Sequence, residues 1–102
     1  RFIEQGPAFD AVFGFTETAL LGAKSVIQKS GLRIPDDVRI CCMSGTTLCT
    51  FVHPTITAVE QPVEQMATET CRLIMAHVAD DAKATEDVVL RGEIIDREST
   101  AG

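Results

Sequence analysis

The sequence predicts an α/β fold built on a parallel sheet. Residues 10–15 and 38–43 are short apolar runs, and the segment between them carries apolar residues at helical spacing. Short apolar runs of this kind are typical of strands buried on both faces of a parallel sheet. A strand, a helix and a second strand in that order form a βαβ unit, whose two strands pair in parallel.

The first helix is predicted to follow Thr16 and to end before Gly31. The Thr16 hydroxyl can accept a hydrogen bond from a free backbone N–H of the first turn, and Gly31 suits the left-handed residue that often ends a helix. Leu21 is expected on a polar face, away from the core, because successive residues turn by about 100° around a helix. The stripe expected to face the core consists of Ala19, Leu20, Ala23, Val26 and Ile27.

The alternation of strands and helices continues along the chain. Residues 34–37 form a predicted turn, residues 44–47 a polar loop, and residues 56–60 a strand with alternating polarity. Pro62 suits the first position of a second helix, where its missing N–H is not needed. The βαβ unit is therefore followed by a third strand and a further helix.

The second helix runs to about residue 79 and carries one apolar stripe. We expect a neighbouring copy or the chain's own sheet to hide this stripe, unless the chain is a proteolytic remnant. After it we predict a polar loop over residues 80–86, a strand or strand pair over residues 88–95 broken at Gly92, and a tail over residues 99–102. The stripe consists of Val63, Met66, Ala67, Thr70, Leu73, Ile74 and Val78.

Length, charge and cysteine usage limit the functions open to this chain. Its 102 residues make at most one small domain, and the connector-like residues 1–7 indicate a fragment. The net charge is −6 and the nine basic residues are scattered, so this piece alone is not expected to hold DNA. No apolar run is long enough to cross a membrane. Four cysteines without regular spacing indicate a reduced, cytoplasmic protein: Cys41, Cys42, Cys49 and Cys71.

No catalytic or metal-binding motif is visible in the sequence. Cys49 and His53 suggest a nucleophile pair, but such a pair needs an orienting group and oxyanion donors. No Cys-x-x-Cys pair offers a zinc hook, and the segment around Ser44 lacks the first glycine of a nucleophile elbow. We therefore expect no enzyme activity, no catalytic residue, no bound metal and no cofactor.

Six short motifs resemble, in order and spacing, the effector-binding domain of LacI/GalR-family transcriptional repressors, near its C-terminal end. The motifs are FDAVFGF at residues 9–15, ALLGA at 19–23, SGLRIPDDV at 30–38, HP at 53–54, ITAVEQP at 56–62 and REST at 97–100. Together they span nearly the whole chain.

The resemblance implies a periplasmic-binding-protein-like fold of two α/β lobes, each with a parallel sheet flanked by helices, joined by three crossovers. Residues 1–102 would be the C-terminal part, without the DNA-binding head and most of the other lobe. Residues 57–62 correspond to one crossover, and the helix over residues 62–79 would pack on the other lobe. The implied partners are a small-molecule effector, a sugar or related metabolite, a second copy in a homodimer, and DNA through an N-terminal helix-turn-helix only.

Candidate effector contacts lie where the first two strands end. In open α/β sheets, ligands bind outside the carboxyl ends of the strands, here at Thr16 and Glu17 and at Ser44 and Thr46. The resembled family typically has Asn-Asp at the first place and a sugar-binding Asp at the second. Ser44-Gly45 removes that charge-assisted contact, which argues against an ordinary monosaccharide. The alternative is that Thr16 only caps its helix and Ser44 only makes a turn.

The resemblance also implies a homodimer interface formed by Leu21, Phe51 and Val52. An apolar residue that faces away from the core is well explained by a partner. The alternative is that Leu21 is a single exposed leucine, which is common on protein surfaces.

The sequence therefore predicts the ligand-sensing and dimerising part of a LacI-like repressor, whose effector changes operator affinity. An alternative is a fragment of a periplasmic sugar-binding protein of the same fold, and the residues before Arg1 would discriminate the two by a helix-turn-helix or a signal peptide. An enzyme of doubly wound fold is a third possibility, but no phosphate loop is present.

Overall fold

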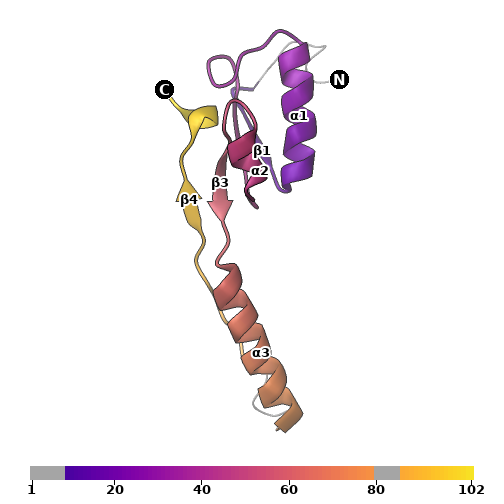
Figure 1. Ribbon diagram of the computed structural model, residues 1–102, viewed down its shortest axis with the longest axis vertical. Helices are drawn as coiled ribbons and strands as arrows, with labels where there is room; N and C mark the ends of the chain where they lie inside the picture. The colour runs from indigo at the N-terminus through magenta and orange to yellow at the C-terminus, as the bar shows by residue number, and fades with distance from the viewer. Residues whose placement is uncertain (1–8, 80–85) are drawn as a thin grey trace. The chain divides into compact units, whose positions relative to one another are not determined.

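The computed structural model describes residues 9–79 and 86–102 of the chain (Figure 1). It separates into two compact units. The first holds the described residues up to Glu60 together with Ile94–Gly102, and the second holds those within Gln61–Glu93. The elements, in order, are β1 (Ala11–Gly14), α1 (Glu17–Lys29), β2 (Arg39–Cys42), α2 (Leu48–Phe51), β3 (Thr57–Glu60), α3 (Val63–Ala79), β4 (Glu93–Ile95) and the 3-10 helix η2 (Glu98–Thr100).

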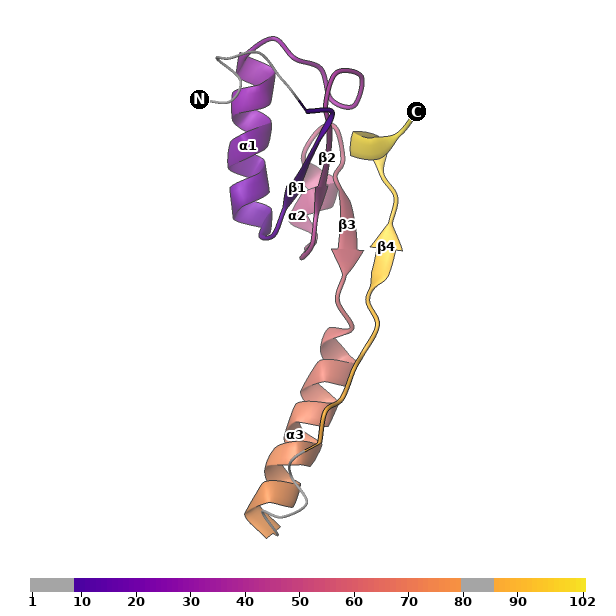
Figure 2. The ribbon, with the colours of Figure 1, turned by 180° about the vertical axis from the view of Figure 1, so that it is seen from behind.

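The sheet confirms the predicted parallel α/β architecture. Its strand order is β1-β2-β3-β4. β2 pairs in parallel with β1, with Ala11 opposite Arg39, and in parallel with β3, with Cys41 opposite Thr57. Figure 2 shows β4 at the edge of the sheet, running in the direction opposite to β3.

Helix α1 begins and ends where the sequence predicts. Thr16 has an extended backbone, and its Oγ1 accepts a hydrogen bond from the backbone N–H of Ala19 at 3.3 Å. Ser30 follows the last turn, and Gly31 adopts the left-handed region with φ of 82°. Both ends are therefore fixed by local chemistry that the residue types specify.

The core-facing row of α1 differs from the predicted stripe. Leu20 and Ile27, seven residues apart, are fully buried, whereas Ala19 is exposed and Val26 is 52% exposed. Leu21 is half-buried and packs against the core, so the prediction that it faces away from the core is wrong. Leu20 and Ile27 belong to one apolar row of α1, and Ala19 and Val26 belong to the adjacent one. The sheet packs against the row that contains Leu20 and Ile27.

The hydrophobic core of the first unit joins α1, the sheet and α2. Burial along β2 alternates: Ile40 and Cys42 are buried, and Arg39 is exposed. This alternation places one face of the sheet against the core, as expected for strand geometry. The core residues are Leu20, Ile27, Val38, Ile40, Cys42, Cys49, Ile56 and Ala58.

The prediction that the first strand is buried on both faces is wrong. Phe13 is 55% exposed, and within β1 only Gly14 is buried. β1 is an edge strand in the order β1-β2-β3-β4. Val12 and Gly14 face the core, whereas Ala11 and Phe13 point to the other face of the sheet, where both are exposed.

The C-terminal segment is part of the fold rather than the predicted tail. Ser99 is fully buried, and its hydroxyl donates to the Ile40 carbonyl at 2.6 Å and accepts from the Thr57 N–H at 2.9 Å. The Glu98 carboxylate accepts from both the N–H and the hydroxyl of Thr55, at 2.9 and 3.0 Å. These bonds join η2 to β2 and to the start of β3.

In the second unit, α3 confirms the predicted helix. Pro62 directly precedes it, and the Pro62 carbonyl accepts from the Met66 N–H at 2.9 Å. No residue of α3 is buried, and Val63 and Val78 are 66% and 77% exposed. The expectation that a neighbouring copy or the chain's own sheet hides this stripe stays a prediction.

Only part of the strand predicted for residues 88–95 forms. β4 covers Glu93–Ile95, and residues 86–92 have no regular structure. Residues 1–7 and the loop predicted at 80–86, apart from Glu86, lie outside the described residues.

Arg72 of α3 forms ion pairs with Glu69 at 2.7 Å and with Glu86 at 3.1 Å. Within the described residues, no helix is both long and apolar enough to cross a membrane.

We predict that Ser99→Ala lowers the free energy of unfolding by about 1 to 3 kcal/mol. The substitution leaves the buried Ile40 carbonyl and Thr57 N–H without their hydroxyl partner. Ser30→Ala is the control, because it removes an exposed hydroxyl that bonds the Val26 carbonyl at 2.8 Å. Urea denaturation checks both variants, and equal stabilities for the two would contradict the role of Ser99.

Candidate functional site

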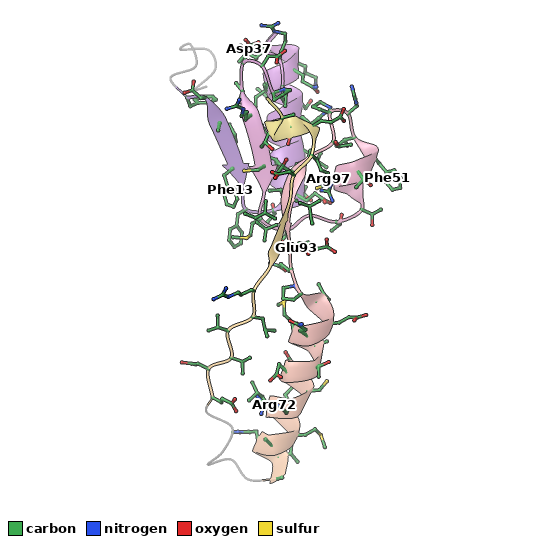
Figure 3. The ribbon with its side chains drawn as sticks, turned by 90° about the vertical axis from the view of Figure 1, so that its left-hand side faces the viewer. Phe13, Asp37, Phe51, Arg72, Glu93 and Arg97 are labelled. Atoms are coloured by element: carbon green, nitrogen blue, oxygen red, sulfur yellow. The ribbon has the colours of Figure 1, made fainter. Side chains whose placement is uncertain are left out.

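The parallel strands bring three loops to one edge of the sheet. β1, β2 and β3 all run in the same direction, so the segments that follow them leave from the same edge. The Met43 N–H donates to the Gly14 carbonyl at 2.9 Å, which keeps the ends of β1 and β2 together. Figure 3 shows Phe13 toward this carboxyl edge and Asp37 at the opposite end of the sheet. Ligands of open α/β folds bind at this edge.

The carboxylate of Glu17 lies at the centre of the polar contacts on this edge. Its Oε2 accepts from the backbone N–H of Thr46 at 2.7 Å, and both oxygens lie within 2.8 Å of the Thr46 hydroxyl. The Cys49 thiol donates to Oε2 at 3.1 Å. Glu17 comes from the first turn of α1, whereas Thr46 and Cys49 come from the loop after β2 and from α2.

These contacts shift the pKa values of Glu17 and Cys49 in opposite directions. Desolvation raises the pKa of Glu17, but the hydrogen bonds from Thr46 and Cys49 outweigh it, and the pKa lies below its usual value. Burial, reinforced by the adjacent Glu17 carboxylate, raises the pKa of Cys49 to about 11. Because the thiolate is the reactive form, Cys49 is unsuited to nucleophilic catalysis.

Metal binding has no support in the described part of the chain. No group of three or more His, Cys, Asp or Glu side chains there could hold a metal ion. His53 is exposed, and its Nδ1 lies 3.6 Å from the Glu98 carboxylate.

The other two predicted effector residues lie on the loops that flank this cluster. Thr16 is exposed, and its hydroxyl caps α1. Ser44 is half-buried, and its carbonyl accepts from the Cys42 thiol at 3.3 Å. The structure therefore brings Glu17 and Thr46 into direct contact and places Thr16 and Ser44 at the ends of the two paired strands.

Gly45 fixes the path of the loop after β2. A Cβ on Gly45 would overlap the Cβ of Ala58 in β3, and the Gly45 N–H points to the Val59 carbonyl at 3.4 Å. Only glycine allows the loop to approach β3 this closely. The backbone at this position is therefore set by packing.

A hollow of about 350 Å³ adjoins the Glu17 cluster, within the first unit. Sequence reasoning included only Thr46 of its lining. The polar run after Gly45 could have indicated Thr47 and Thr50, but no local pattern indicates Arg97, whose Nη1 donates to the Ile56 carbonyl at 2.7 Å. The lining consists of Gly45, Thr46, Thr47, Thr50, Ala58, Glu60, Ile95 and Arg97.

The three residues predicted for a dimer interface differ in exposure. Phe51 is 78% exposed, and Figure 3 shows its side chain pointing outward from α2. Val52 is half-buried and packs against the core, as Leu21 does. Phe51 is thus the member of this set that offers a free apolar surface.

The sequence matches known proteins over nearly its whole length. Residues 2–100 match the model of the periplasmic binding protein-like domain. The HTH-type transcriptional regulator CelR of Thermobifida fusca is 31% identical over 99 residues, which cover 97% of this chain and 29% of the relative. The chain thus spans less than a third of the length of that relative.

Solved structures share the fold. A CelR–cellobiose complex aligns over 95% of this chain and 30% of its own, with a TM-score of 0.85 and 31% identity. A LacI family transcriptional regulator from Enterococcus faecalis, with bound ribose, aligns over 97% of this chain and 37% of its own. Its TM-score is 0.84 and its identity 26%.

We predict that Gly45→Ala destabilises the protein by about 1 to 3 kcal/mol, because the new methyl group overlaps Ala58. The matched control is Gly22→Ala in α1, where a Cβ meets no atom within 4 Å. That control should stabilise the helix by about 0.5 to 1 kcal/mol, since alanine is the better helix former. Thermal unfolding distinguishes them, and a stabilised Gly45→Ala variant would show that the loop does not pack as described.

Proposed function

The chain belongs to the periplasmic binding protein-like domain family, in the form carried by LacI/GalR-type regulators, and on this premise we propose that it is the C-terminal part of a repressor's effector-binding domain. In the intact protein, a sugar or related metabolite would bind between two lobes. An N-terminal helix-turn-helix outside this chain would bind the operator. The effector acts by changing operator affinity.

The observation that carries this proposal is the polar edge of the parallel sheet. Hydroxyl, carboxylate and backbone groups gather there beside a hollow of about 350 Å³, within the size range of small-molecule sites. Hydroxyl-rich ligands are recognised by such groups. We propose that Thr16, Ser44 and Thr46 contact the effector at this edge, and that Glu17 belongs to the same site.

The solved relatives support a sugar as the class of effector. One solved relative is a complex with cellobiose and another holds ribose. The relatives named above are transcriptional regulators, which favours a regulator over a periplasmic sugar-binding protein. The proposed protein is a cytoplasmic sensor without enzymatic activity. Effector coupling of this kind typically amounts to about 1 to 3 kcal/mol.

We also propose that the intact regulator is a homodimer with Phe51 in its interface, flanked by Leu21 and Val52. A phenylalanine that is 78% exposed leaves a large apolar surface in water. Leu21 and Val52 are partly buried and pack against the core. The symmetry of a two-fold dimer would place the same patch on both subunits.

Ser44→Ala should weaken effector binding to the complete regulator by about 1 kcal/mol or more, if the Ser44 hydroxyl is a buried partner of the effector. Calorimetry with cellobiose and ribose measures the affinity. Ser25→Ala, on α1, is the control and should leave it unchanged. Failure of the complete regulator to bind either sugar would count against a sugar effector, and an unchanged affinity for the Ser44 variant would remove Ser44 from the site.

Phe51→Asp and Leu21→Asp should both shift the complete regulator toward monomers, because each places a charge in an apolar contact. Val26→Asp on α1 is the control, since Val26 is also exposed but belongs to no proposed contact. Sedimentation velocity over a range of concentrations gives the dimer strength. A dimer of wild-type strength in the Phe51 variant would show that the interface lies elsewhere.

A further inference from the structure

Most of the acceptor positions of the Glu17 carboxylate are occupied by donors of the protein itself. A carboxylate offers about four acceptor positions, and the Thr46 N–H, the Thr46 hydroxyl and the Cys49 thiol occupy three of them at 2.7 to 3.1 Å. A side chain so occupied has little capacity left for the hydroxyls of an effector. Its geometry is that of a group that holds other residues in place.

The same contacts extend from Glu17 to α2. The Thr46 hydroxyl donates to Glu17 and accepts from the Leu48 N–H at 3.3 Å, the first residue of α2. The Cys49 thiol is fully buried and also donates to Glu17. One carboxylate therefore joins the first turn of α1 to the loop after β2 and to the start of α2.

The connected segments carry both proposed functional surfaces. The loop held by Thr46 contains Ser44, at the proposed effector site, and α2 ends at Phe51, in the proposed dimer surface. A short loop and a four-residue helix have few backbone hydrogen bonds of their own, so side-chain contacts contribute much of their order. Glu17 supplies three of these contacts from outside the segment.

We infer that Glu17 is a positioning residue for effector binding, which holds the loop over residues 44–47 and the start of α2, and that it does not itself contact the effector. The predicted effect of Glu17 on effector affinity rests on the proposed function. Its effect on the order of the loop does not, because those hydrogen bonds form within the protein. A glutamine at this place keeps the size of the side chain but replaces one acceptor oxygen with an NH₂ group, which cannot accept from Thr46 or Cys49.

The first measurement is hydrogen–deuterium exchange of the complete regulator without sugar. Glu17→Gln and Thr46→Val should each speed the exchange of residues 44–50 by roughly tenfold or more, since each removes hydrogen bonds to a charged group. Thr46→Ser keeps the hydroxyl and should restore the slow exchange. Exchange in β2, at Arg39–Cys42, should stay unchanged in all three variants.

The second measurement is the affinity of the same variants, and of the double variant, for cellobiose and ribose by calorimetry. If Glu17 acts only through Thr46, Glu17→Gln and Thr46→Val each weaken binding by roughly tenfold, and the double variant loses no more than the larger single loss. Thr46→Ser should bind like the wild type.

The outcomes distinguish the positioning role of Glu17 from the proposal that the effector is a sugar. Additive losses in the double variant, or weaker binding by Glu17→Gln without faster exchange of residues 44–50, would make Glu17 a direct effector contact and overturn the inference. Unchanged exchange in Glu17→Gln would also overturn it. If the wild type binds neither sugar while exchange responds as expected, the sugar proposal fails and the positioning role of Glu17 stands.

Discussion

The parallel pairing of β2 with a strand on each side is the constraint on which the rest of this structure depends. A central strand has its backbone groups bonded on both edges, and Ile40 and Cys42 fill the core on its covered face. Parallel neighbours need crossover connections, which α1 provides on one side and the loop with α2 on the other. The same pairing sends the three chain segments that follow β1, β2 and β3 out at one edge of the sheet.

The C-terminal segment closes this arrangement with hydroxyl groups. Ser99 reaches between β2 and β3, and the Thr57 hydroxyl accepts from the Arg97 N–H at 2.8 Å. Buried polar atoms need partners, and in the described residues no buried side-chain nitrogen or oxygen lacks one. This segment is far from β2 in sequence, yet it completes the hydrogen bonding beside the central strand. It also places Arg97 at the hollow next to Thr46.

The candidate site depends on a glycine in the loop after β2 and on the polar cluster around Glu17. Gly45 lets the loop pass against Ala58, and Glu17 ties that loop to α1 and α2. The position that typically carries a sugar-binding Asp in the resembled family is Ser44-Gly45 here. Under the proposed function, the effector would meet the hydroxyl of Ser44 and backbone groups at this place rather than a carboxylate. The Glu17 carboxylate is directed to the protein's own donors, on Thr46 and Cys49.

The sequence by itself determined the features that depend on neighbouring residues. The βαβ order, the Thr16 cap, the Gly31 stop and the start of α3 after Pro62 follow from apolar spacing and from backbone chemistry within one turn. The positions of Glu17 and Thr46 at the strand ends follow from the same patterns. What only the tertiary structure decided depends on which surfaces meet. The sheet buried Leu20 and Ile27 of α1 and left Ala19 and Val26 exposed, the face of β1 that carries Phe13 stayed uncovered, and η2 docked where a tail was expected. Contacts between residues 29 to 59 positions apart, such as Glu17 with Thr46 and Ser99 with Ile40, leave no periodic trace in a sequence, because their partners are set by packing rather than by spacing.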